Sequence, residues 1–173
     1  MDIMIDIETL STKPNATILN IAAQAFDPFS PTFYEQQFYT RVDVEDQDGR
    51  DIDDGTMEWW SKQGADAQEE AFGEDNRMPL KESLEQLTKI CWNADRIWAN
   101  GIAFDMTILE DAYKSFGMPI PWQYYKVCDA RTVYKMNPDR ERLGNSHHAL
   151  EDVVLQIDLL QRTLAKLGIK SLG

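Results

Sequence analysis

The chain has 173 residues with 43% hydrophobic and 10% aromatic side chains, which is enough apolar material for one compact domain and excludes a disordered protein. No apolar run approaches the roughly 18 residues of a membrane span, and the first residues do not resemble a signal peptide. The formal net charge of −13 argues against tracking along duplex nucleic acid, because proteins that do so contact the phosphates through basic side chains.

The first predicted elements are three strands. Residues 1–7 carry isoleucine at every second position from residue 3, which is typical of a strand with one buried face. Residues 18–26 and 32–42 are the next strands, and the turn sequence D-P-F-S-P separates them. We expect these three strands to form an antiparallel meander.

The next stretch of the chain is strongly acidic. Residues 43–75 contain thirteen acidic and two basic side chains, a net charge of −11, and we interpret the start of this stretch as a loop. Thr56 is a candidate cap for a short helix that carries Trp59 and Trp60. Pro79 then begins a longer helix, because leucines follow it at helical spacing.

Strands and helices alternate in the second half of the chain. A short buried strand over residues 96–99 precedes a helix that runs from about Phe104 to Gly117. A fifth strand over residues 124–128 and a short helix over residues 130–135 follow. This alternation favours parallel strands with crossover helices.

The last predicted helix starts after Asn145 or Ser146 and ends at Gly168. It follows residues 126–142, which have a net charge of +2. Taken together, the elements predict a single α/β domain over residues 1–173. Its mixed five-stranded sheet would join an antiparallel meander to parallel strands, with helices on both faces.

Four carboxylates and one histidine lie where predicted strands end or helices begin. Asp6 and Glu8 are two residues apart on the first strand and so project from one face. Asp105 lies in the first turn of its helix, Asp152 about one turn into the last helix, and His147 at the start of that helix. Each acid alone has an ordinary explanation, such as a helix-dipole effect of about 0.3–1 kcal/mol. Gathered around one centre, they indicate hard divalent cations.

The order D-x-E, N-x-x-x-F-D and H-x-A-x-x-D resembles the DnaQ-like, DEDDh family of 3′–5′ exonucleases, which have a ribonuclease-H-like fold. The resemblance extends from Asp6 to Asp152. The tyrosine subclass would need Tyr where this chain has His148, so the chain resembles the histidine type. Its compact size and its M-E-W-W element resemble phage and prophage exonucleases of the exonuclease A type and mycobacterial exoribonuclease-like members.

The resemblance implies that the four carboxylates bind two Mg²⁺ or Mn²⁺ ions, with Asp6 bridging both. Two such cations about 3.5–4 Å apart can activate a water and stabilise the leaving oxygen of a phosphodiester. His147 would be the general base that takes a proton from the attacking water, since histidine titrates near neutral pH. An exchange of roles between His147 and His148 stays open.

The same resemblance assigns further residues to the substrate. Thr9 and Leu10 would contact the terminal nucleotide through backbone groups and an apolar wedge. Phe104 would pack under the terminal sugar or base. Asn100 would orient the turn that carries the third carboxylate.

Two tryptophans and a few polar residues have competing interpretations. Trp60 is a candidate for base stacking, with core packing as an equal alternative, whereas core packing is favoured for Trp59. Asp129 would orient a ligand or the histidine. Arg131 and Lys135 would meet the phosphates or lie on the surface as solvated charges.

The predicted function is a metal-dependent 3′–5′ exonuclease. It would act on single-stranded or 3′-overhang DNA or RNA and release nucleoside 5′-monophosphates. The main alternative is a catalytically inactive member of the fold that binds nucleic acid or acts as a scaffold, although none of the five site residues is missing. An endonuclease of the ribonuclease H type and a two-carboxylate glycosidase fit the motifs less well.

The expected surroundings follow from the same observations. Cys91 and Cys128 have neither metal-binding nor redox spacing, which indicates reduced thiols in the cytoplasm of a bacterium or of a phage-infected host. The expected partner is the 3′ end of a nucleic acid and not a membrane. A homodimer stays an alternative to the monomer.

Overall fold

The three N-terminal strands form the antiparallel half of a mixed sheet, as predicted. In the computed structural model, which describes residues 1–138 and 147–172, they are β1 (Asp2–Thr9), β2 (Ile18–Asp27) and β3 (Thr32–Val42). β1 pairs with β2 and β2 pairs with β3, both antiparallel. The meander therefore places β1 in the middle of the sheet, with its other edge open to a parallel partner.

The parallel half consists of three short strands. β5 (Arg96–Ala99) pairs parallel with β1, β6 (Val127–Asp129) pairs parallel with β5, and the two-residue β4 (Arg77–Met78) pairs parallel with β3. In the described part of the chain, the order β4-β3-β2-β1-β5-β6 has six strands instead of the predicted five. The additional strand β4 is too short to produce a periodic pattern in the sequence.

The fifth predicted strand is only partly correct. Residues Tyr124–Lys126 form a 3₁₀ turn (η1) that leads into β6. Tyr124 and Tyr125 favour strands by composition, but they are 86% and 68% exposed, so no neighbouring strand covers them.

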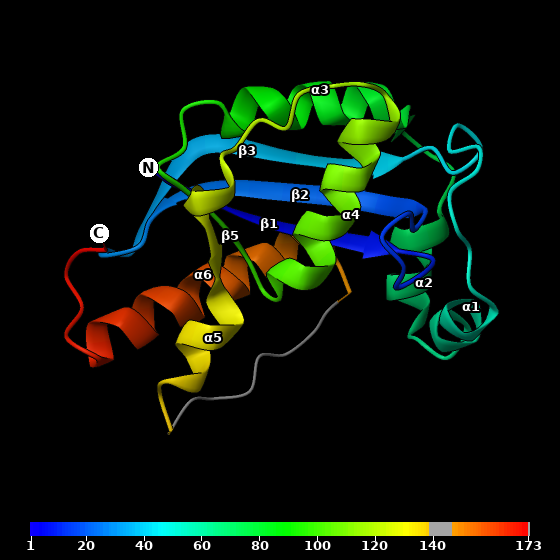
Figure 1. Cartoon of the computed structure of the whole chain (residues 1–173). Helices are drawn as coiled ribbons and strands as arrows, with labels where there is room; N and C mark the ends of the chain where they lie inside the picture. Colours follow the sequence, from blue (N-terminus) through cyan, green and yellow to red (C-terminus); the bar gives the residue numbers. More distant parts are fainter. Residues whose placement is uncertain (139–146, 173) are drawn as a thin grey trace.

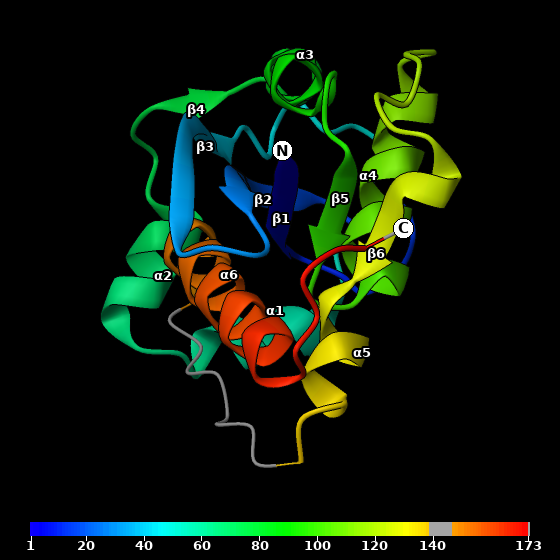
Figure 2. The same ribbon diagram turned by 90° about the vertical axis from the view of Figure 1, so that its left-hand side faces the viewer.

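Helices cover both faces of the sheet (Figures 1 and 2). α3 (Leu80–Cys91) and α4 (Ile102–Ser115) share one apolar core with every second residue of β1 from Ile3. α5 (Ala130–Lys135) and α6 (Ala149–Lys166) share the core on the other face, which includes Met4. Since side chains alternate along a strand, Asp6 and Glu8 lie on the α6 side of β1.

Two more helices lie beyond the carboxyl end of β1 (Figure 1). α1 (Asp54–Ser61) begins after Asp53, whose side chain accepts a hydrogen bond from the Thr56 backbone N–H at 2.8 Å. The predicted cap at Thr56 was therefore three residues late. α2 (Ala65–Phe72) was not predicted, because the sequence A-D-A-Q-E-E-A-F buries only two alanines.

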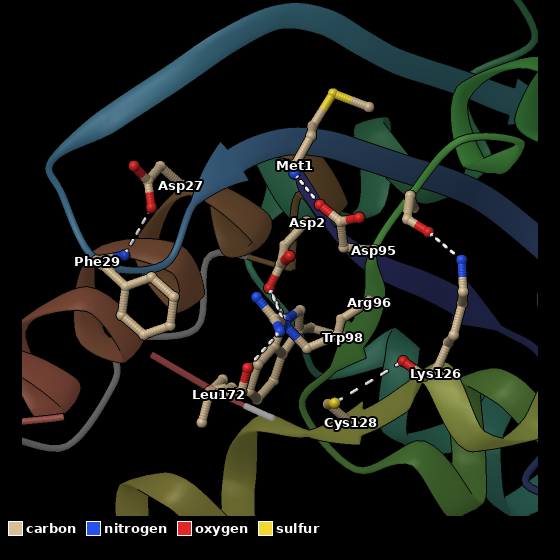
Figure 3. A network of polar contacts seen from close by, with 11 residues as sticks. Met1, Asp2, Asp27, Phe29, Asp95, Arg96, Trp98, Lys126, Cys128 and Leu172 are labelled. Carbon is tan, nitrogen blue, oxygen red and sulfur yellow. Dashed lines mark hydrogen bonds and ion pairs between the residues drawn. The ribbon is translucent and has the colours of Figure 1, made fainter. Parts of the chain in front are cut away.

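The opposite end of β1 is fastened by a polar network (Figure 3). Asp2 is fully buried and accepts hydrogen bonds from Arg96 Nε at 2.8 Å and from Trp98 Nε1 at 2.7 Å. The same guanidinium donates to the backbone carbonyl of Leu172 at 3.3 Å. This network ties β1, β5 and the C-terminal segment together, and it lies at the end of β1 away from Asp6 and Glu8.

The last helix begins at Ala149, with His148 at its N-cap, and ends at Lys166. The predicted starting points Asn145 and Ser146 lie outside the described residues, as do Arg140 and Arg142 of the basic stretch. Within the described part of the chain, no helix is long and apolar enough to cross a membrane.

Candidate catalytic site

Three of the predicted metal-binding carboxylates meet at the carboxyl end of β1. Asp6 and Glu8 project from β1, and Asp152 projects from the first turn of α6. One oxygen from each lies within 4.8 Å of the others, which is close enough for the three to share a metal ion. Asp152 is buried, with 5% of its surface exposed, and the two strand residues are half-buried. Residues 146 positions apart in the sequence therefore form one acidic centre.

Asp105, the fourth carboxylate, reaches the centre from the opposite face of the sheet. It lies in the first turn of α4 and is 4% exposed. Its Oδ1 accepts a hydrogen bond of 3.2 Å from the backbone N–H of Ile7, the residue between Asp6 and Glu8. Asp105 is therefore adjacent to the other three carboxylates, although it is not part of the group whose oxygens lie within 4.8 Å of one another.

Burial and mutual repulsion make this centre costly to ionise. Burial, followed by the charges of Asp152 and Asp105, raises the pKa of Glu8 to about 8. Burial raises the pKa of Asp105 to about 7, although backbone hydrogen bonds from Ile7 and from Asp105 itself lower it. Burial, then the charges of Asp105 and Glu8, raise the pKa of Asp6 well above its ordinary value. A centre with these properties favours cations.

Gln156 is a site residue that the sequence analysis missed. Its Nε2 donates a 2.8 Å hydrogen bond to Asp6 Oδ1, and its side chain is only 4% exposed. The hydroxyl of Tyr134 donates to the Gln156 backbone carbonyl at 2.8 Å, so α5 supports this turn of α6. The signal was present, because Gln156 follows Asp152 by four residues and therefore shares its face of the helix.

His147 lies beside the two tryptophans of α1. Its ring centroid is 4.8 Å from that of Trp59 and 6.0 Å from that of Trp60, and both contacts are edge-on. Its backbone is left-handed, with φ of 55°, which is uncommon for a residue other than glycine. Such strain persists only where the surroundings hold it.

His148 has different neighbours. Its ring stacks on Tyr39 of β3 with a centroid distance of 5.2 Å, and its Nε2 lies 3.6 Å from Glu70 Oε2 on α2. The two histidines therefore contact different elements. This separation favours His147 over His148 as the residue that faces the substrate.

A pocket of about 390 Å³ lies against the acidic centre. Glu8 and Thr9 of β1 line it together with Trp59 and Trp60 of α1 and Phe104 of α4. Trp59 is 43% exposed, so part of its surface is open to a ligand. The prediction that Trp59 packs in the core is wrong.

Trp60 and Leu10 are core residues. Trp60 borders the pocket, but it is 1% exposed and its Nε1 donates to the Thr9 carbonyl at 2.9 Å, so almost none of its ring surface is open to a base. Leu10 is 3% exposed and packs with Trp60. Its N–H donates to Thr17 O and its carbonyl accepts from Asp53 N. Burial therefore favours core packing for Trp60 and Leu10, while their assignment to the substrate stays a prediction.

The turn between β5 and α4 is held by Arg131. Its Nη2 donates to the Asn100 carbonyl at 2.6 Å, and its guanidinium lies 3.2 Å from where a Cβ on Gly101 would be. Gly101 has φ of 119°, so both conformation and space require glycine there. The charge of Arg131 lowers the pKa of Asp105, whereas that of Asp129 raises it. Arg131 and Asp129 therefore change the pKa of Asp105 in opposite directions.

A family model described as the 3′-5′ exoribonuclease Rv2179c-like domain matches residues 1–164. Among curated proteins, the chain is similar to an exodeoxyribonuclease of Enterobacteria phage T4, with 28% identity over 124 residues. That alignment covers 64% of this chain and 54% of the phage protein, so the chain spans about half the length of this relative.

Solved structures share the fold at low identity. S. pombe Pop2p in its Mg²⁺- and Mn²⁺-bound form has a TM-score of 0.67 and 13% identity, covering 99% of this chain and 86% of that one. The nuclease domain of 3′hExo, a DEDDh family member bound to rAMP, has a TM-score of 0.59 and 12% identity, covering 98% and 93%. Exonuclease X in complex with 5′ overhanging duplex DNA has a TM-score of 0.52 and 18% identity, covering 97% and 93%. These likenesses confirm the predicted ribonuclease-H-like fold.

Proposed function

Because the chain belongs to the family of Rv2179c-like 3′-5′ exoribonuclease domains, we propose that it is a metal-dependent 3′–5′ exonuclease that releases nucleoside 5′-monophosphates. The observation that carries this proposal is the convergence of Asp6, Glu8 and Asp152 within 4.8 Å at the edge of a pocket. The family match confirms the resemblance inferred from the three motifs. The reaction and the roles of individual residues are our proposal.

The chemistry of the acidic centre fits divalent cations. Its donors are carboxylate oxygens, the ligands that Mg²⁺ and Mn²⁺ prefer, and burial makes their charge costly without a cation. We propose that Asp6, Glu8, Asp105 and Asp152 hold two such ions. Two bound cations would activate the attacking water and stabilise the leaving oxygen. S. pombe Pop2p, which has the same fold, is described in an Mg²⁺- and Mn²⁺-bound form, which is consistent with divalent cations on this fold.

The chain's own residues would supply the base and the alignment. His147 would take the proton from the attacking water, and the indoles of Trp59 and Trp60 would fix the plane of its imidazole. Gln156 would hold Asp6 in one orientation through its 2.8 Å hydrogen bond. These contacts make the geometry of the centre rigid before substrate arrives.

The pocket suits the end of a single strand. Trp59 and Phe104 would bracket the terminal base or sugar, and the Thr9 backbone would contact the terminal nucleotide. The acidic stretch of residues 43–75 includes α1 and α2, so the surface beside the pocket would repel a long duplex. The proposed substrate is therefore a short single-stranded 3′ end or a 3′ overhang.

The comparisons point to both polymers, because the family description names an exoribonuclease and the phage relative is an exodeoxyribonuclease. The test uses 5′-labelled RNA and DNA oligomers of the same sequence with Mg²⁺, Mn²⁺ or EDTA, and Asp6→Asn as the control enzyme. We expect a ladder that shortens from the 3′ end only with metal and only with the unmodified chain. Internal cuts would indicate an endonuclease. Binding without cleavage would indicate an inactive nucleic-acid-binding module.

A further inference from the structure

We propose that His148 is a positioning residue, which Tyr39, Glu70 and Arg41 hold in place so that His147 stays against the indoles of Trp59 and Trp60, which line the catalytic pocket. This inference rests on the proposed function, because it concerns the residue proposed as the base. It adds a set of contacts on β3 and α2 that lies outside the acidic centre. We refer to Tyr39, Arg41, Glu70 and His148 as the histidine clamp.

The clamp begins with two side chains on the same face of β3. Tyr39 and Arg41 are two residues apart on that strand and pair with β2 at Ala22 and Asn20. Tyr39 forms the platform on which the His148 ring stacks, at 5.2 Å between centroids and 25° between planes. Because β3 pairs with β2 at this residue, the platform is held by the sheet and fixes the position and tilt of the imidazole.

The second part of the clamp comes from α2. Glu70 Oε2 lies 3.0 Å from Arg41 Nη2 and 3.6 Å from His148 Nε2, so one carboxylate oxygen lies between the guanidinium and the imidazole. The Glu70 side chain is 13% exposed and that of Arg41 is 19% exposed, which limits screening by solvent. The bridge therefore connects the start of α6 to both β3 and α2.

The clamp acts on His147 through a single peptide bond. His147 has a left-handed backbone, and its ring lies edge-on to Trp59 of α1. A non-glycine residue keeps such a conformation only where the surrounding structure holds it. On the C-terminal side the fixed neighbour is His148, which also caps α6 and accepts a hydrogen bond from Asp152 N at 3.0 Å. Loosening His148 would let the backbone of His147 relax and turn its ring away from the indoles of Trp59 and Trp60.

The chain offers a matched pair of variants for the test. Tyr39 Oη is buried and has no hydrogen-bond partner among the described residues, so Tyr39→Phe keeps the stack and serves as the control. Tyr39→Leu removes the stack, and Glu70→Ala removes the bridge. Neither substitution touches His147, and circular dichroism would confirm that both variants are folded.

The activity assay measures kcat and KM on a single-stranded oligomer with Mn²⁺. We expect Tyr39→Leu and Glu70→Ala to lower kcat by about 10- to 100-fold, because small displacements of a catalytic group have effects of that size. KM should change little, since none of the clamp residues lines the pocket. The control should keep the kcat of the unmodified enzyme.

A structural readout separates this inference from the proposed function. The sequence contains only two histidines, so an NMR spectrum of the ring Cε1–Hε1 groups has two signals, which His147→Gln and His148→Gln would assign. The ring currents of the indoles should shift the His147 signal away from the chemical shift of an exposed histidine. This difference in chemical shift should become smaller in Tyr39→Leu and Glu70→Ala but not in Tyr39→Phe.

The outcomes are distinct. An unmodified chain without nuclease activity would refute the proposed function, while the NMR comparison would still decide whether the clamp holds His147. In an active chain, an unchanged kcat or an unchanged His147 signal in the folded Tyr39→Leu and Glu70→Ala variants would overturn the inference. A parallel loss of Mn²⁺ affinity would overturn it as well, because the clamp would then hold α6 as a whole and not His147 in particular.

Discussion

Gln156 Nε2 donates a hydrogen bond of 2.8 Å to Asp6 Oδ1, which joins the second turn of α6 to the middle strand of the sheet. This contact opposes burial and like charge, because it lowers the pKa of Asp6 while both of those effects raise it. It also leaves Asp6 with one defined orientation toward Glu8 and Asp152. The amide is therefore part of the proposed metal centre, although it carries no charge.

The first prediction concerns this amide. Gln156→Leu keeps the volume and removes the donor, so Asp6 becomes free to rotate and harder to ionise. We expect Mn²⁺ affinity and kcat/KM to fall by about 10- to 100-fold, as is usual when the partner of a metal ligand is lost. Calorimetric Mn²⁺ titration and an oligomer assay would measure both values.

The control for this variant is Asp158→Asn on the same helix. Asp158 pairs with Arg162 at 2.7 Å, and both side chains are more than half exposed, so the pair contributes little. If Gln156→Leu bound Mn²⁺ as tightly as the Asp158→Asn control, Gln156 would have only a packing role.

The second prediction concerns stability as a function of pH. The pKa values of Glu8 and Asp105 are about 8 and about 7 in the folded state, above the ordinary values of 4.5 and 3.8. At pH values between the ordinary and the folded-state pKa of each group, the folded chain binds more protons than the unfolded chain. The free energy of unfolding therefore falls as pH rises through this range. In EDTA we expect a Tm that is several degrees lower at pH 8.5 than at pH 6.

Metal and mutation should each reduce this pH dependence. Mn²⁺ binds the ionised carboxylates of the folded state, so it should raise Tm most at pH 8.5. Glu8→Gln removes one of the two raised pKa values and retains the other acids of the chain. In EDTA it should therefore reduce the fall in Tm between pH 6 and pH 8.5. A Tm in EDTA that rises from pH 6 to pH 8.5 would contradict the placement of Glu8 and Asp105 in a buried acidic centre.

The sequence predicted the elements whose pattern is local. The alternating isoleucines of β1 identified both the strand and the face on which Asp6 and Glu8 lie. Pro79 marked the N-cap of α3 correctly. α2 was missed because its buried face consists of Ala67 and Ala71, which give almost no hydrophobic signal within an acidic stretch.

The tryptophans show what a local pattern cannot decide. Trp59 and Trp60 are adjacent on α1, and nothing in M-E-W-W says which one faces the core. The answer depends on the position of Thr9, whose carbonyl accepts the Trp60 N–H from 51 residues away. Gln156 was missed for a different reason, because a glutamine in a helix is ordinary until its partner on β1 is known.

The third prediction concerns the proposed base. His147→Ala should lower kcat by about 10²- to 10⁴-fold, the usual contribution of general-base catalysis, because the other imidazole of the chain stacks on Tyr39 and not beside Trp59. Mn²⁺ affinity should stay unchanged, because the carboxylates are intact. The measurement is a single-turnover rate together with a Mn²⁺ titration. A rate equal to that of the unmodified chain would transfer the role to His148.

The fourth prediction separates the two tryptophans of α1. Trp59 is 43% exposed and lines the pocket, whereas Trp60 is 1% exposed and packs with Leu10 and Leu19. Trp59→Ala should weaken binding of a short single strand by about 1–3 kcal/mol, the range for one stacked base, and leave stability nearly unchanged. Trp60→Ala should lower the free energy of unfolding by about 3–5 kcal/mol, the range for a large aromatic removed from a core.

Fluorescence anisotropy with a labelled oligomer and urea unfolding would measure the two quantities for both variants. Trp59→Phe is the matched control, since it retains an aromatic face and should keep most of the affinity. The binding role of Trp59 would be lost if Trp59→Ala and Trp59→Phe bound the oligomer equally well. Because Trp59 also contacts His147 at 4.8 Å, its removal should lower kcat as well as affinity, and Trp59→Phe should restore part of both.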